Sequence, residues 1–135
     1  MSAHTEHITQ QFQKADNLLR VHGLLSIIFG SLGVLAGLLF LLLIGIGSAA
    51  SLRLEDTIGA FAFGIFVFVL FILPHIYLII AGAYMMKQPT PKLARVLVII
   101  NLVLGVFWNF VLLVFAIINL VQIDEYERAY PKRKS

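Results

Sequence analysis

A histidine that follows a proline inside a long apolar run is the residue best placed to do chemistry. His75 comes directly after Pro74 within the otherwise uncharged residues 58–86, and an ionisable side chain inside a membrane span often marks a functional site. Pro74 lacks a backbone N–H, so it frees a carbonyl and kinks the helix beside the histidine. With Tyr77, Asn101 and Asn119, this pair predicts a small polar site within the membrane.

A structural role is the alternative, in which His75, Asn101 and Asn119 only hydrogen-bond between helices. The apolar runs contain no Asp or Glu, which removes the buried carboxylate that proton-coupled exporters need. The chain has no cysteine and no phosphate-binding, metalloprotease or serine-nucleophile motif. His22 lies at the edge of the first span, at a different depth from His75, so no shared histidine pair is expected. We therefore expect no enzymatic activity, no cofactor and no metal.

The composition predicts that lipid is the solvent for most of the chain. Of the 135 residues, 60% are hydrophobic and only 13% are charged, whereas soluble domains have about 25% charged residues. The net charge of +3 comes from basic residues beside apolar runs, which orient a membrane protein. We expect partners to be the lipid bilayer and either another membrane protein or a second copy of this chain, with no nucleic acid.

Apolar runs at residues 23–47, 58–86 and 93–123 predict an all-α membrane bundle. The first spans ~37 Å as a helix, enough to cross a ~30 Å hydrocarbon core. The last would be ~46 Å long as one helix or ~22 Å for each of two helices. Its length therefore leaves three and four spans open.

The basic residues favour four transmembrane helices, because cytoplasmic loops collect Lys and Arg. With four spans, all of the ten basic residues except Arg53 lie on one side, whereas three spans divide them equally. The run then splits into spans at residues 93–107 and 110–123, with a tight outer turn at Trp108 and Asn109. Both termini are expected in the cytoplasm, with residues 124–135 as a charged tail.

Residues 1–22 are polar, but they carry an apolar stripe at helical spacing, formed by Ile8, Phe12, Ala15 and Leu19. This predicts a short amphipathic helix on the membrane surface, with a frayed polar tail as the alternative.

Small residues four apart allow helices to approach closely in lipid. They occur at Ser26, Gly30, Gly33 and Gly37 of the first span and at Ala60 and Gly64 of the second. We expect these positions to pack helices within the chain, or alternatively to form a dimer seam.

The layout resembles small bacterial multi-span membrane proteins that have no assigned function. The resemblance rests on a Gly-rich first span (LLSIIFGSLGVLAGLLFLLL), a basic turn with proline (KQPTPKLAR) and a closing apolar segment with an acidic stop (NLVLGVFWNFVLLVFAIINLVQIDEYER). It implies a bacterial cytoplasmic membrane protein, and it implies no activity or cofactor.

Three functions follow as hypotheses. The first is a non-enzymatic accessory or scaffold subunit of a membrane assembly, because catalytic groups and external domains are lacking. The second is a small oligomeric transporter or channel that uses the Pro74–His75 region. The third is a membrane-surface adaptor that uses the basic sequence YPKRKS and the N-terminal stripe to meet anionic lipid.

Single cysteines test the four-span topology directly, because the natural chain has no thiol. We expect a membrane-impermeant thiol reagent to label Ser51→Cys and Asn109→Cys from outside, and to leave Ser2→Cys and Ser135→Cys unlabelled until the membrane is opened. Labelling of Ser135→Cys from outside would contradict four spans.

Overall fold

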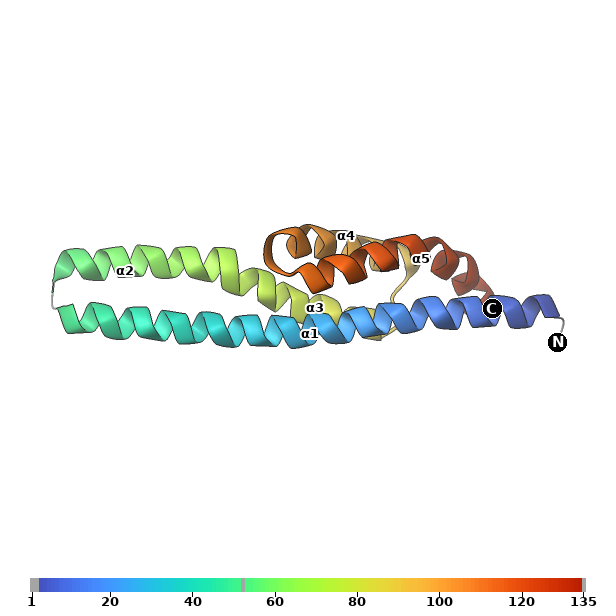
Figure 1. Cartoon of the computed structure of the whole chain (residues 1–135), viewed down its shortest axis with the longest axis horizontal. Coiled ribbons are helices and arrows are strands. Elements are labelled where there is room, and N and C mark those ends of the chain that lie inside the picture. Colours follow the sequence, from blue (N-terminus) through green and yellow to red (C-terminus); the bar gives the residue numbers. More distant parts are fainter. Residues whose placement is uncertain (1–2, 52, 135) are drawn as a thin grey trace. The chain divides into compact units, whose positions relative to one another are not determined.

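The structure, a computed structural model, is all-α as the sequence predicted. It describes residues 3–51 and 53–134, with side chains through residue 130. The elements in chain order are α1 (Ala3–Ser51), α2 (Leu54–Val67), the π-helical segment η1 (Phe68–Ile72), α3 (Leu73–Met86), α4 (Pro91–Trp108) and α5 (Phe110–Lys134) (Figure 1). Three helical stretches are long and apolar enough to cross a membrane: α1, the continuous Leu54–Met86, and α4. The chain is therefore an integral multi-pass membrane protein.

The ambiguous run at residues 93–123 forms two helices, and the break lies at Asn109 as predicted. Asn109 has an extended backbone and donates its N–H to the Gly105 carbonyl at the end of α4. Its side-chain oxygen accepts the N–H groups of Val111 and Leu112 at 3.0 and 3.2 Å. One asparagine thus ends α4 and caps α5 without the Pro or Gly that usually marks such a turn.

The two helices of this hairpin differ in how far they could cross a bilayer. The 18 residues of α4 make a helix of ~27 Å, and the apolar part of α5, residues 110–123, measures ~21 Å. From Asp124 onward α5 is charged, and it continues as helix to Lys134. The expected tail is therefore helical, although the side chains of residues 131–135 lie outside the described part of the chain.

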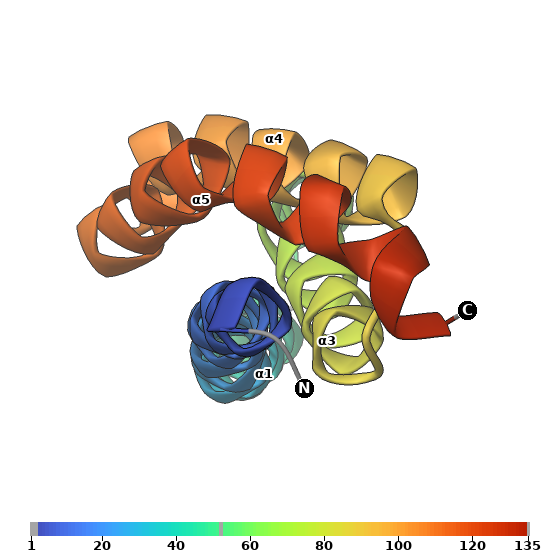
Figure 2. The ribbon, with the colours of Figure 1, turned by 90° about the vertical axis from the view of Figure 1, so that its right-hand side faces the viewer.

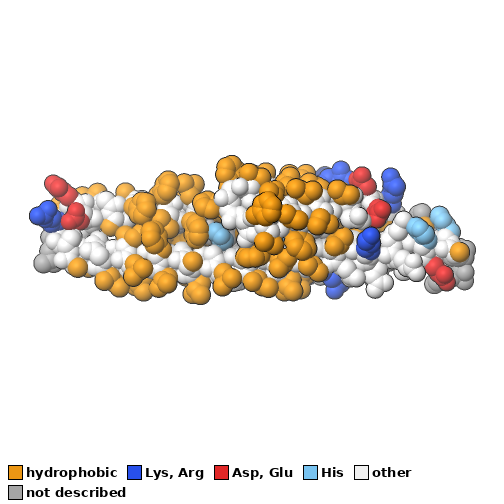
Figure 3. Space-filling model, viewed as in Figure 1, with side chains coloured by type: hydrophobic (Ala, Val, Ile, Leu, Met, Phe, Trp, Pro, Cys, Tyr) orange, Lys and Arg blue, Asp and Glu red, His pale blue; other side chains and the backbone are white. Residues whose placement is uncertain are grey.

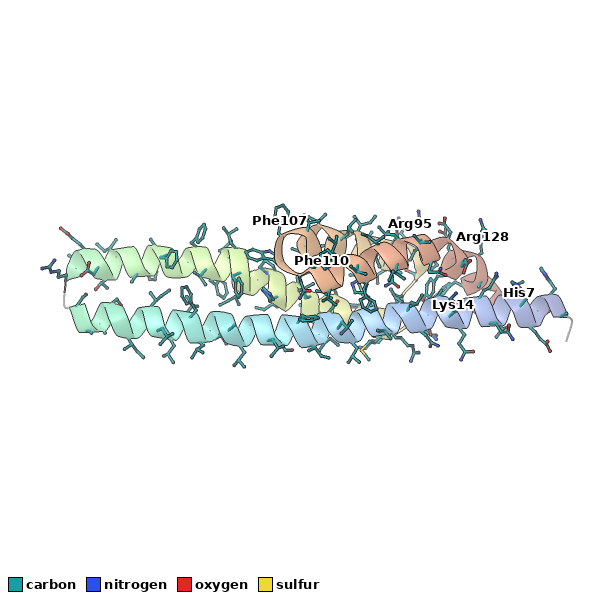
Figure 4. The ribbon with its side chains drawn as sticks, in the orientation of Figure 1. His7, Lys14, Arg95, Phe107, Phe110 and Arg128 are labelled. Carbon is teal, nitrogen blue, oxygen red and sulfur yellow. The ribbon has the colours of Figure 1, made fainter. Side chains whose placement is uncertain are left out.

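The helices form two compact units, made of residues 1–27 with 80–135 and of residues 28–79. In the first unit, α4 and α5 pack as an antiparallel hairpin. This hairpin lies as a layer over the N-terminal part of α1 and the C-terminal end of α3 (Figure 2). Figure 4 shows Phe107 and Phe110 at the tip of this hairpin and Arg95 and Arg128 toward its open end.

Polar contacts hold the open end of the first unit together. Arg95 donates to Asp124 at 3.1 Å and to Glu127 at 2.8 Å, which ties α4 to α5. The Tyr126 hydroxyl donates to the Pro89 carbonyl at 2.7 Å, which ties α5 to the turn before α4.

That turn is also tied to α1. Gln88 adopts a positive φ of 51°, and its side-chain N–H donates to Asp16 Oδ2 at 3.1 Å. Arg20 Nε donates to the same oxygen at 3.1 Å. Thr90 then caps α4, and Pro91 occupies its first turn, where the missing N–H does no harm.

The N-terminal stripe faces protein and not the membrane surface. Phe12, Ala15 and Leu19 are buried, and the Phe12 ring stacks on Tyr126 of α5 with ring centroids 5.1 Å apart. Residues 3–22 are the beginning of α1 and do not form a separate interfacial helix. Their apolar stripe packs against α5.

The second unit is a hairpin of the later part of α1 with α2, η1 and the beginning of α3. Three of the predicted packing glycines lie at its helix contact. A Cβ on Gly30 would come within 2.7 Å of the His75 carbonyl, one on Gly37 within 2.6 Å of Ile72, and one on Gly33 would overlap the His75 ring. Glycine is needed at these positions because a larger residue would force the helices apart.

Candidate functional site

Four polar side chains from three helices meet in the interior of the first unit. They are His22 and Ser26 of α1, Asn101 of α4 and Asn119 of α5, with exposed fractions of 0%, 0%, 0% and 3%. His22 and Ser26 share one face of α1 because they are four residues apart. The two asparagines face them from the two arms of the α4–α5 hairpin.

The asparagines contact both sides of the His22 ring. Asn101 Nδ2 lies 3.1 Å from His22 Nε2 and 3.0 Å from Ser26 Oγ. Asn119 Nδ2 lies 3.1 Å from His22 Nδ1 and donates to the Phe115 carbonyl at 2.8 Å. We name this group of four residues the His22 cluster.

A close helix contact brings α3 against α1 beside the cluster. A Cβ on Gly23 would lie 2.7 Å from the Gly82 carbonyl and 2.9 Å from Met85. Gly105 allows an equally close contact between α4 and α5, since a Cβ there would lie 2.7 Å from the Leu113 nitrogen. Glycines at the helix crossings therefore let the polar side chains reach each other.

The interior around the cluster is tightly packed. The gap beside Asn119, Gln122 and Tyr126 is too narrow to admit a water molecule. The side-chain oxygens of Asn101 and Gln122 are buried without a hydrogen-bond partner among the described residues. Within the described chain, no group of three His, Cys, Asp or Glu side chains is arranged to hold a metal ion. The geometry suits helix-to-helix bonding more than the passage of a solute.

The structure brings together two of the five residues predicted for a polar site, Asn101 and Asn119. Their recorded partners are His22 and Ser26, neither of which the sequence analysis placed in that site. The missed signal was the four-residue spacing of His22 and Ser26 beside Gly23, read together with two asparagines that needed partners. His22 was set aside because it lies at the edge of the apolar run.

Pro74, His75 and Tyr77 belong to the second unit. His75 is half-buried, its Nδ1–H donates to the Phe71 carbonyl at 2.7 Å, and its ring lies 4.5 Å from the Phe71 ring. The π-helical turn η1 ends two residues before Pro74, and such turns are frequent at functional sites. The Tyr77 hydroxyl is buried without a hydrogen-bond partner among the described residues. A working polar site at these residues stays a prediction.

The His22 cluster should contribute measurably to the stability of the first unit. We expect Asn119→Ala and His22→Ala each to lower the free energy of unfolding by about 1 kcal/mol, the scale of interhelical hydrogen bonds in membranes. The double variant should lose less than the sum, because the two side chains share one bond. Unfolding in mixed micelles measures these values, with exposed Ile118→Ala as the control. Strictly additive losses would contradict the contact.

Comparison with known proteins assigns no relative to this chain: no protein family matches its sequence, and neither curated proteins nor solved structures yielded a similar protein. The sequence and structure together define a small all-helical multi-pass membrane protein with three long apolar helices.

Proposed function

We propose that this protein is a non-enzymatic accessory or scaffold subunit that docks a helix of a larger membrane assembly. The observation that carries the proposal is an open groove in the second unit, whose lining includes small residues between large apolar ones. The groove has a volume of about 440 Å³ and lies between α1 and α2. Its lining residues are Leu41, Ile44, Gly45, Ser48, Thr57, Ala60, Phe61, Gly64, Ile65 and Phe68.

The glycines of the chain support this use of the groove. Those at residues 23, 30, 33, 37, 82 and 105 each lie where a Cβ would come within 3 Å of another helix. At Gly45, Gly47 and Gly59, by contrast, a Cβ would meet nothing within 4 Å. Glycine costs roughly 1 kcal/mol relative to alanine in a helix. A backbone arriving from another molecule would give Gly45, which lines the groove, the role that the other glycines have within the chain.

The surroundings of the groove fit a partner that lies in the membrane. Apolar side chains cover this hairpin on the face drawn in Figure 3, and charged side chains gather at its turn. Those charges, Arg53, Glu55 and Asp56, are exposed. In lipid, close packing of small residues replaces the hydrophobic effect as the force between helices, so a small-residue groove suits a transmembrane helix.

We place the protein in a bacterial cytoplasmic membrane with both termini in the cytoplasm. The hairpin of α4 and α5 supports this orientation, because it returns the chain to the side on which α4 begins. Lys87, Lys92 and the basic end of α5 then share one side, whereas Arg53 lies in the loop between α1 and α2. That distribution agrees with the cytoplasmic preference of Lys and Arg.

The second candidate function is an oligomeric transporter or channel that uses Pro74 and His75. The π-helical turn η1 and the half-buried imidazole favour it. This alternative requires that His75→Leu abolish a measured flux while the protein still accumulates and assembles. A loss of assembly alone would leave His75 a structural residue.

Filling the groove should separate docking from folding. We expect Gly45→Leu to abolish the co-purification of a stoichiometric partner from native membranes in mild detergent, with the partner identified by mass spectrometry. The matched control is Gly47→Leu, which makes the same change at an equally open position two residues away that does not line the groove. Both substitutions raise helix propensity alike.

Equal co-purification in the two variants would overturn the docking role of the groove. If the wild-type protein forms a homo-oligomer without any partner, this result favours the transporter function. Flux measurements with His75→Leu then decide between the two functions.

A further inference from the structure

We propose that the His22 cluster is a pH-sensitive latch, which holds α1 to the α4–α5 hairpin while the imidazole is neutral and releases it on protonation. The proposal rests on the positions of hydrogen-bond donors and acceptors around one buried ring. It does not depend on the docking groove, which belongs to the other unit.

Asn119 fixes the protonation state of the first ring nitrogen. Its Nδ2 donates to the Phe115 carbonyl at 2.8 Å, so its amide cannot turn over without setting two oxygens against each other. The same NH₂ group faces His22 Nδ1 at 3.1 Å. Nδ1 must therefore be the acceptor, and in a neutral imidazole the proton then resides on Nε2.

Asn101 can bond the other ring nitrogen after a half-turn of its amide, which exchanges nitrogen and oxygen. In the arrangement with Nδ2 toward His22, the Asn101 oxygen is buried without a partner. After the half-turn, that oxygen accepts from His22 Nε2 and from the Ser26 hydroxyl, whose positions lie 3.1 and 3.0 Å from the amide atom. The neutral Nε2–H form of His22 is therefore the form that bonds all three helices.

Protonation removes one of these bonds and adds a charge. A charged imidazolium has N–H donors on both nitrogens, so Nδ1–H would confront the NH₂ group that Phe115 holds in place. Among the described residues, no anion bonds to the ring from the elements packed on it. The facing groups are Ser26 of α1, Asn101 of α4, and Phe115 and Asn119 of α5.

The nearby charged groups of each element form ion pairs among themselves. The nearest in sequence are Asp16 and Arg20 on α1, Arg95 on α4 and Asp124 on α5, and all four are engaged in ion pairs with one another or with Glu127. Near Gly82, α3 presents Met85, which is uncharged. Because a buried charge without a partner is costly, we expect protonation to loosen α1 from the hairpin.

Spin labels test the release in the full chain, which has no natural cysteine. Labels on Lys14→Cys of α1 and Lys92→Cys of α4, both exposed, report their separation in lipid nanodiscs by pulsed electron spin resonance. Between about pH 8 and about pH 4.5, a range that extends below the usual titration of histidine because the buried charge would have no partner, we expect the distance distribution to shift to longer values. The same pair with His22→Gln should show no pH-dependent shift, although His4, His7 and His75 remain.

An identical response to pH in both proteins, or none in the wild-type background, would overturn the latch. Nitrogen NMR of histidine-labelled wild-type protein provides a second test that needs no substitution at His22. At neutral pH we expect His22 to have an unprotonated Nδ1 and a protonated Nε2. The opposite tautomer, or a charged ring at that pH, would refute the proposal.

Discussion

A polar side chain inside a membrane needs a partner within the protein, because hydrocarbon offers no hydrogen bonds. In the first unit, His22 meets this constraint by drawing one asparagine from each arm of the α4–α5 hairpin. The arms are antiparallel, so Asn101 and Asn119 can reach the same ring only if the hairpin turns where Asn109 ends α4. His22 therefore bonds α1 to both arms of the hairpin at one level of the first unit.

Glycine has two different uses in this chain. Within each unit it lets helix backbones come close enough for side chains such as His75 or the His22 cluster to fit between them. In the groove of the second unit, by contrast, no other helix of the chain packs against Gly45, because a Cβ there would meet nothing within 4 Å. The contrast separates packing that the chain completes by itself from packing that we assign to a partner. The proposed docking surface belongs to the second unit, and the polar interior belongs to the first.

The sequence was sufficient for the fold class, the apolar runs and the break at Asn109, because hydropathy, charge bias and turn chemistry are local properties. It was insufficient for the polar interior. The partners of Asn101 and Asn119 are far away in sequence, and His22 looked like an edge residue because Arg20 lies just before it. The sequence also did not show which surface Phe12, Ala15 and Leu19 pack against, since an apolar stripe packs equally well on lipid or on α5. Only the hairpin geometry decides between these surfaces.

The most direct test of the central contact is solid-state NMR of the protein in lipid bilayers, with carbon-labelled histidine and side-chain nitrogen-labelled asparagine. We expect through-space correlations from the His22 ring to the amide nitrogens of both Asn101 and Asn119, with each correlation lost when that asparagine is replaced by leucine. A His22 ring that correlates with neither amide would contradict this contact, because the imidazole would then bond α1 to neither α4 nor α5.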